Sequence, residues 1–429
     1  MRQRKHRPLR RSSLPRNGDL RRLAVFSIAG CVGLALPHPT VAEVIVAATA
    51  AVQYEYNSNL FDLQPGFTIP GAAYTKRSDW SKDYSASAQL NAVWGRQSVY
   101  FVAGVDDLRY QYYSFLDHTD YKFKGGWNWR ILAALDGKIE ISRTRSMVPF
   151  SETLQSRLAL QTEQRESMAA GWLFAPDWRL DSDAYRRVLQ EPLAGAPDLR
   201  LSEWFAETTL NFIGRAGLVA GVNATYLDGD FSGASSQNPS YHQDTAGIRA
   251  IYQPTGRSSF AGEVGFTRRV SALQIDDVSG ATGKLAYTNQ VTPKTSITLN
   301  VARNINTYVA GTGADFDTLA GLAFKWQATY KVRVSAGYTY TYSYFPRQGE
   351  LPGTNRNDHF QLTSISIDFE PRRWIVLRPY INLQRRTSDF GGATFNSSEV
   401  GMSFNVYWSC APPGTPDALQ VSGILPCRT

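Results

Sequence analysis

Three histidines beyond residue 42 are the side chains best suited to acid–base chemistry: His118, His242 and His359. A hydrolase needs a nucleophile beside such a base, usually with a carboxylate that orients the ring. Asp244 follows His242 closely and Asp358 precedes His359, but this spacing matches no catalytic motif. The sequence contains neither a G-x-S-x-G elbow nor an H-E-x-x-H helix motif. We therefore interpret all three as solvated loop histidines, and predict no enzyme activity, no metal site and no cofactor.

A larger set of charged side chains alternates with apolar ones along the chain. If the chain forms strands, these charges share one face. The cations are Lys122, Lys124, Arg130, Lys138, Arg249, Arg269, Lys284, Lys331, Arg333 and Arg378. The acids are Asp136, Glu140, Glu203, Glu207, Glu263, Asp368 and Glu399. The slight excess of cations favours a polar or anionic solute over a cationic one. The alternative is a set of ion pairs that stiffen the wall and select nothing.

Six of these cations are the candidate solute contacts. They are Lys122, Lys124, Arg130, Arg249, Arg333 and Arg378. Arg130 and Arg333 stand first among them, because a guanidinium group binds a carboxylate through two parallel hydrogen bonds.

The element that must position these side chains is the β-strand, because apolar residues recur with a period of two from residue 44 onward. Val99, Phe101, Ala103 and Val105 form one such set, and Val400, Met402, Phe404, Val406 and Trp408 form the last. Successive side chains on a strand point to opposite faces, so each set covers one face. Helical periodicity is hard to find. The segment 151–170 reads as either a helix or a polar strand.

Turn signals divide the strands regularly. Eight short turns are expected, at 95–98, 132–133, 175–177, 214–217, 254–256, 292–294, 328–330 and 371–373. They alternate with nine longer polar stretches, such as 63–79, 228–243 and 345–358. Short turns alternating with long loops are typical of a transmembrane β-barrel. We predict an all-β, antiparallel transmembrane barrel of about eighteen strands, with sixteen as the other count. A soluble propeller would show a recurring blade motif, which we do not find.

Aromatic residues near strand ends support a membrane setting. Trp94, Tyr110, Trp127, Tyr342 and Trp408 occupy such places, and aromatic side chains form girdles at both membrane interfaces. The run of alternate tyrosines from Tyr338 to Tyr344 shares the phase of the apolar face. We assign it to a girdle, with a sugar-stacking ladder as the alternative.

The charge balance argues against nucleic acid as a partner. The chain of 429 residues has a formal net charge of +8, but residues 1–42 hold nine of its 45 basic residues and one of its 37 acids. The remaining chain is neutral, and binding to nucleic acid depends on neutralising phosphates.

The ends of the chain have their own signals. Residues 1–42 have the order of a secretory signal peptide: a basic segment, the apolar run 23–36, and a small residue, Ala42, before the cut. An uncleaved anchor and lipidation at Cys31 are the alternatives. We expect the barrel to occupy residues 43–408 and a periplasmic tail to occupy 409–429. Export places Cys410 and Cys427 in an oxidising compartment, where they are candidates for a disulfide.

The first predicted strand carries a motif that is similar to a known group. The run 54–61 (YEYNSNLF) resembles the opening Y-x-x-N-(S/D)-N-(L/V)-F of outer-membrane barrels found in bacterial exopolysaccharide gene clusters. Residues 120–130 and 143–150 are similar to the same group. The nearest match is the EpsL-type family associated with exosortase systems. The resemblance implies a barrel that moves or anchors extracellular polysaccharide, and it implies no established site residues.

The sequence therefore predicts a monomeric barrel of the Gram-negative outer membrane that passes a polar or anionic polysaccharide as part of an export system. Its expected partners are outer-membrane lipid, the polysaccharide, and periplasmic or inner-membrane export components. The alternatives are a closed surface barrel that anchors polysaccharide, a general diffusion porin and, last, a barrel hydrolase. A porin usually has a long loop folded into its lumen, and 63–79 is the segment best able to supply one.

Overall fold

The computed structural model describes residues 43–66, 76–153, 157–191, 199–232, 240–272, 277–307, 314–346 and 355–410. The predicted signal peptide and the tail from 411 onward, with Cys427 and hence the disulfide to Cys410, lie outside the described residues. Within the described ranges, no helix is long and apolar enough to cross a membrane.

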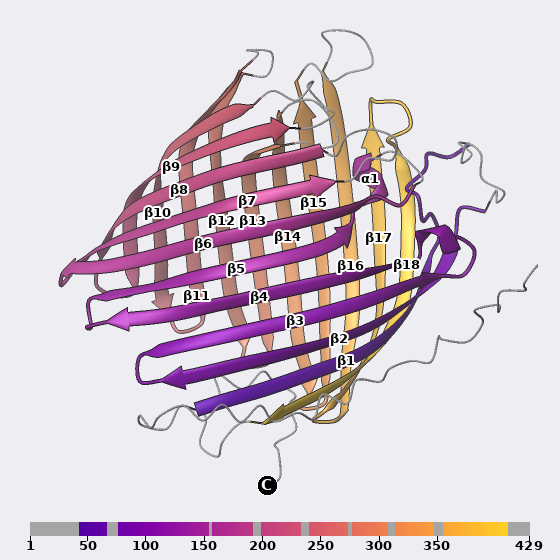
Figure 1. Cartoon of the computed structure of the whole chain (residues 1–429), viewed down its shortest axis with the longest axis horizontal. Coiled ribbons are helices and arrows are strands. Elements are labelled where there is room, and N and C mark those ends of the chain that lie inside the picture. The colour runs from indigo at the N-terminus through magenta and orange to yellow at the C-terminus, as the bar shows by residue number, and fades with distance from the viewer. Residues whose placement is uncertain are drawn as a thin grey trace, which may run out of the picture. The chain divides into compact units, whose positions relative to one another are not determined.

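Eighteen strands make up nearly all of the described chain (Figure 1). They are β1 Glu43–Asn57, β2 Asp79–Trp94, β3 Gln97–Tyr110, β4 His118–Ile131, β5 Leu135–Met147, β6 Leu160–Ala175, β7 Trp178–Glu191, β8 Leu199–Ile213, β9 Leu218–Ser232, β10 Tyr241–Thr255, β11 Ser258–Ser271, β12 Val278–Thr292, β13 Thr295–Thr307, β14 Ala314–Thr329, β15 Val332–Phe345, β16 Arg356–Arg372, β17 Ile375–Ser388 and β18 Phe395–Cys410. Two short helical turns interrupt the pattern, η1 Ser114–Leu116 and α1 Phe150–Thr153.

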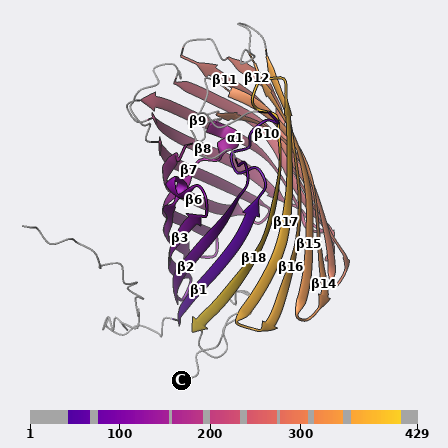
Figure 2. The ribbon, with the colours of Figure 1, turned by 90° about the vertical axis from the view of Figure 1, so that its right-hand side faces the viewer.

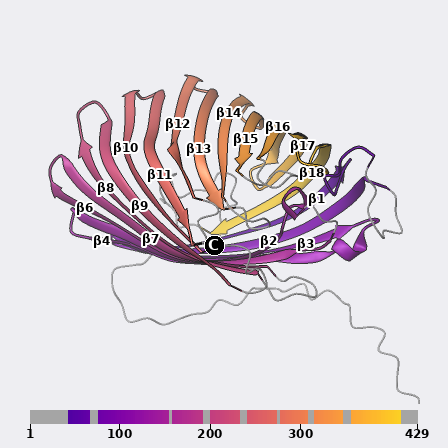
Figure 3. The ribbon, with the colours of Figure 1, turned by 90° about the horizontal axis from the view of Figure 1, so that it is seen from above.

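The strands form one closed antiparallel sheet in which each pairs with its neighbours in sequence. Closure comes from β1 and β18, which pair from Val46 opposite Cys410 to Asn57 opposite Glu399 (Figure 2). Seen from above, the strands follow one another around a ring (Figure 3). The prediction of an eighteen-stranded transmembrane-type barrel is confirmed.

The connections fall into two kinds, as predicted. All eight short turns lie between the strands expected to flank them, at one end of the barrel, which we call the turn end. The longer segments join the strands at the other end, which we call the loop end. Two of the short turns contain a glycine with a positive φ angle, +60° at Gly95 and +72° at Gly217. Glycine adopts this conformation without a steric penalty.

The two faces of the wall differ in chemistry. Large apolar side chains such as Phe101, Val264 and Met402 alternate along their strands and are 49%, 53% and 55% exposed. Polar and charged side chains occupy the opposite phase. Because a polar face enclosed by the ring can hold water, the outer face is the one suited to lipid.

Several details differ from the sequence prediction. The strands have 13 to 17 residues and continue beyond the apolar band. Within the predicted loop 228–243, residues 228–232 belong to β9 and residues 241–243 belong to β10. Segment 151–170 divides between α1 and β6. Strand β18 ends at Cys410, two residues beyond the predicted boundary at Trp408.

Tyr110 is a further correction, because it belongs to the inner face. On β3 the exposed apolar side chains Val99, Phe101 and Val105 have odd numbers, which gives Tyr110 the inward phase. It packs against a cluster of buried side chains at the loop end rather than contributing to a girdle.

Two substitutions on β16 test the assignment of the faces. Ile365 is outward and 45% exposed, and its sequence neighbour Ser364 has the inward phase. We expect Ile365→Arg to lower the free energy of unfolding by about 2–4 kcal/mol, because it places a cation in the lipid-facing band. The matched Ser364→Arg should change it little. Urea titration of the protein refolded into lipid vesicles measures both, and equal losses would contradict the assignment.

Candidate functional site

All six predicted lumenal cations have the inward phase on their strands. Lys122 and Lys124 flank the exposed Phe123, for example, and Arg333 lies between Val332 and Val334 on the inner side of β15. The structure therefore places the six on the inner wall. Their contact with a solute stays a prediction.

Lys122 and Lys124 have different surroundings although they share a strand. The Lys124 ammonium lies 3.0 Å from Oε2 of Glu140, which also receives the Lys138 ammonium at 2.6 Å. Lys122 is exposed and has no carboxylate oxygen within 4.0 Å among the described residues. Lys124 thus stiffens the wall, whereas Lys122 is available to the lumen.

Arg333 and Arg378 share one acid. Nε of Arg333 lies 3.4 Å from Oδ2 of Asp368, and Nη2 lies 3.2 Å from Oε1 of Glu370. Arg378 donates through Nε to the other oxygen of Asp368. Asp368 is buried beneath the two guanidinium groups. Arg333, a leading candidate for solute contact, is therefore neutralised by its neighbours.

Arg249 and Arg130 line a cavity of about 500 Å³ in the wall near the turn end. Its charged lining consists of five cations and four acids: Arg96, Arg130, Lys138, Arg179 and Arg249, with Asp136, Asp181, Asp183 and Glu207. Most of these side chains have the inward phase, so the cavity faces the lumen.

Arg179 organises this cavity. Its two terminal nitrogens donate to the two oxygens of Asp136 at 2.9 and 3.0 Å, and Nε donates to Asp181 at 2.7 Å. Such a bidentate pair is strong and fixed in direction. Arg249 donates through Nε to Oδ1 of Asn211 at 3.1 Å, and its other nitrogens lie 3.9 Å or more from the nearest acids.

Arg130 is left without a carboxylate partner. It lies directly across the sheet from Asp136, but Arg179 occupies both oxygens of that acid. Its side chain is exposed, and within the described ranges no carboxylate oxygen comes within 4.0 Å of it. Among the described residues, the cavity therefore retains an exposed guanidinium group that is not ion-paired.

Sequence reasoning missed Arg179 and Asp181, although the signal was present. In the segment 179–187, Arg179, Asp181, Asp183, Tyr185 and Arg187 alternate in the phase of the inner wall. The register of this region was uncertain because the flanking apolar residues are few.

At the loop end, three segments pack together into what we call the cap: residues 58–66, 111–117 and 148–153. Phe61, Tyr113, Leu116 and Phe150 form its buried core. The Phe61 ring lies 4.8 Å, centroid to centroid, from the rings of both Tyr113 and Phe150. Because each segment contributes apolar side chains, the three are held as one unit.

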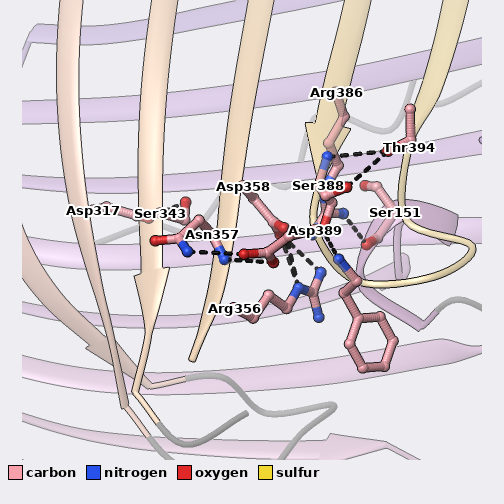
Figure 4. A network of polar contacts seen from close by, with 11 residues as sticks. Ser151, Asp317, Ser343, Arg356, Asn357, Asp358, Arg386, Ser388, Asp389 and Thr394 are labelled. Atoms are coloured by element: carbon pink, nitrogen blue, oxygen red, sulfur yellow. Dashed lines mark hydrogen bonds and ion pairs between the residues drawn. The ribbon is translucent and has the colours of Figure 1, made fainter. Parts of the chain in front are cut away.

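Segment 148–153 reaches across the mouth of the barrel. The carbonyl oxygen of Ser151 accepts a hydrogen bond of 2.7 Å from Nη1 of Arg386, an inward residue of β17 (Figure 4). Between β5 and β17 lie β18 and β1 to β4. Arg386 also pairs with Asp358, which accepts from Arg356 at 2.8 Å. A buried ionic cluster on β16 and β17 thus anchors the cap to the wall.

The described segment that folds over the mouth is 148–153, whose Phe150 side chain is buried in the core of the cap. Most of the predicted inward loop 63–79 lies outside the described residues, because 67–75 are not among them. One other prediction is corrected. His118 is not solvated: it is 6% exposed, and Nδ1 lies 2.6 Å from the carbonyl oxygen of Leu116. His242 and His359 are exposed, as predicted, but they lie on β10 and β16 rather than in loops.

The N-x-N-(L/V)-F motif has a structural explanation here. The buried Asn59 amide donates to the carbonyls of Leu63 and Asn396 at 2.9 and 3.0 Å, and its oxygen accepts from the Leu63 amide. Oδ1 of Asn57 accepts a hydrogen bond of 2.8 Å from the backbone N–H of Asn59. Phe61 then enters the core of the cap. The motif folds the first long loop back onto the barrel.

Searches of known proteins give structural likeness only. No family model matches the chain, and no curated protein matches it. OccAB3 of Acinetobacter baumannii aligns over 85% of this chain and 99% of its own, at 9% identity and a TM-score of 0.47. OpdK of Pseudomonas aeruginosa, solved with vanillate, aligns over 85% and 99% at 9% identity and 0.46. The FrpB iron transporter of Neisseria meningitidis aligns over 80% and 62% at 10% identity and 0.49.

The deciding observation is the pair of faces on a closed barrel: an exposed apolar exterior and a charged interior. In water such an exterior would aggregate, whereas in lipid it is satisfied. The protein is a β-barrel of the Gram-negative outer membrane. Its turn end is therefore periplasmic and its loop end extracellular.

Asp62 gives the cap of this outer-membrane barrel a sensitivity to pH. Its backbone has a φ of +52°, an uncommon conformation outside glycine that Asp and Asn tolerate. Burial, together with the nearby Glu399 carboxylate, raises the pKa of Asp62 from 3.8 to about 7, and Arg386 offsets this only partly. The packed cap therefore favours the protonated acid.

We expect the packed cap to be most stable at low pH. A carboxyl with a raised pKa stabilises the packed state below its ordinary pKa of 3.8, and this advantage is lost as the pH rises to about 7. Hydrogen exchange of the Leu60 and Asp62 amides, which donate to Arg77 and Asn59, measures this. The protection of these two amides against exchange, corrected for the intrinsic exchange rate, should decrease as the pH rises from 5 to 8. The Asp62→Asn variant keeps the backbone conformation and should lose this slope; an unchanged slope would contradict the assignment.

Proposed function

We propose that this barrel is a channel that takes part in the export of an extracellular polysaccharide bearing acidic groups. The observation that carries the proposal is the free Arg130 beside the ion-paired Arg179 and Arg249 in the periplasmic cavity. A transport pathway needs sites that are attractive enough to enter and weak enough to leave. Cations that are mostly neutralised by wall acids, with a few left free, meet that requirement for an anionic chain.

Aromatic rings on the inner wall support a sugar as the transported unit. The Tyr185 and Phe205 rings stack at 4.6 Å on β7 and β8, and the Arg165 guanidinium lies 3.8 Å from the Tyr185 centroid. The rings can stack on the apolar faces of a sugar, and the neighbouring charged groups can bind its polar edges.

The motif at 54–61 supports the same proposal through its resemblance to barrels of exopolysaccharide gene clusters. On this proposal, the polymer is driven by its synthesis or by an inner-membrane component, and the barrel supplies a passive wet passage. Periplasmic and inner-membrane export proteins would then be its partners.

A second candidate is a diffusion channel for small anionic solutes. The inward-folded segment 148–153 favours it, because a porin narrows its lumen with such a segment. The two candidates differ in whether a polymer can enter from the periplasmic side.

Single-channel conductance of the purified protein in a planar bilayer tests the proposal. The host exopolysaccharide added to the periplasmic side should block the current reversibly, whereas neutral dextran of the same size should not. Block by small anions but not by the polysaccharide would favour the diffusion channel. A closed barrel, or one indifferent to both, would contradict both candidates.

The role of Arg130 has its own test. We expect Arg130→Gln to weaken block by the polysaccharide by a factor of about 1.4 to 5, because one exposed ionic contact contributes roughly 0.2–1 kcal/mol. The matched control is Arg303→Gln, which removes the same charge from the outer face. Equal effects of the two variants would show that net charge, rather than the cavity, governs the block.

A further inference from the structure

The outer wall carries an unpaired group of arginines at one place. Arg143 and Arg145 on β5 and Arg186 on β7 share the phase of exposed apolar side chains such as Ile141 and Met168. All three lie toward the extracellular ends of their strands. We call these three residues the arginine patch.

The acid beside the patch is Glu166, and in the described part of the chain it forms no ion pair with these arginines. Glu166, across the sheet from both Ile141 and Arg186, is its nearest outward acid, and its Oε1 accepts from Gln164 at 2.9 Å. Among the described residues, no carboxylate oxygen comes within 4.0 Å of Arg143, Arg145 or Arg186. Nε of Arg186 is buried and has no hydrogen-bond partner there.

A groove begins directly below the patch. It has a volume of about 310 Å³, and its outward lining includes Ile139, Ile141, Met168, Ala184 and Trp204. Ala184, between larger neighbours, forms its floor. The Arg186 guanidinium closes the extracellular end and lies 5.5 Å from the centroid of the Trp204 ring.

The register places the cations at the level of lipid head groups. Ile141, Glu166, Arg186 and Trp204 form one row across β5 to β8, and Arg143 and Arg145 lie two and four residues further toward the extracellular end. Apolar side chains dominate the rows below. A ligand with an anionic head and acyl chains therefore matches both parts of the site.

We propose that the arginine patch and its groove bind a phosphate-bearing lipid of the outer leaflet. The phosphates contact Arg143, Arg145 and Arg186, and an acyl chain lies in the groove over Ala184. Arginine is suited to this because its planar fork pairs with phosphate through charge-assisted hydrogen bonds. Beyond β8, the outward residues of β9 and β10 at the same end include the acids Asp228, Asp230 and Asp244, so the positive surface does not continue onto those strands.

Native mass spectrometry of the whole barrel in detergent tests the proposal, with bis-phosphorylated lipid A as the probe. We expect it to remain bound, and Arg143→Gln/Arg145→Gln/Arg186→Gln to weaken binding about tenfold or more. Dephosphorylated lipid A should bind weakly to the native protein. Inorganic phosphate at the same concentration should not displace the lipid; displacement would identify a simple anion site and overturn the proposal.

Two further variants keep the test decisive. Arg268→Gln/Arg303→Gln removes outward arginines from β11 and β13 and should leave lipid binding unchanged. Ala184→Trp fills the groove without changing any charge and should also weaken binding, so it replaces the triple variant if that one fails to fold. The proposal would be overturned if the folded triple variant or Ala184→Trp bound lipid A with native affinity. It would also be overturned if Arg268→Gln/Arg303→Gln lost as much lipid binding as the triple variant. The outcome is independent of the proposed transport function, because conductance is measured separately.

Discussion

The constraint on which the rest of this structure depends is that no backbone amide or carbonyl can be left unpaired in lipid. Each unsatisfied group in hydrocarbon costs several kcal/mol, so a spanning sheet must close. The twelve register pairs between β1 and β18 supply that closure. With an even number of strands, closure places both ends of the barrel chain on the periplasmic side. It also divides every strand into one face for lipid and one for water.

The inner face uses its charges mainly against each other. Arg333 and Arg378 share Asp368, and Arg179 engages both Asp136 and Asp181. These pairs hold the side chains against the wall, so the lumen is lined by fixed groups rather than filled by mobile ones. The cost is that a cation such as Arg130, whose cross-strand acid is already occupied, is left facing water. That leftover charge is what a passing anion would meet.

The extracellular mouth follows a different principle, because its segments lie outside the sheet. Three of them pool their apolar side chains in the small core around Phe61, Tyr113, Leu116 and Phe150. A core of this size is weak alone, and the buried pair of Arg386 and Asp358 ties it to β17 and β16. The carbonyl of Ser151 and the carboxyl of Asp62 approach the same guanidinium. The packing of the cap and the ionisation of Asp62 are therefore coupled.

The sequence by itself determined the class of fold, the short turns and the two faces, and it left the strand number between eighteen and sixteen. It could do so because a period of two is a local property, and because lipid imposes it on every strand. Lys122, Lys124, Arg130, Arg249, Arg333 and Arg378 could be assigned to the inner face from phase alone. Only the tertiary structure decided which of them are neutralised, since Arg130 loses Asp136 to Arg179 from a strand 43 residues further on. It also decided that His118 is buried and that segment 148–153 folds inward. Those outcomes depend on contacts between segments as far apart as Ser151 and Arg386, and such contacts leave no periodic trace in the chain.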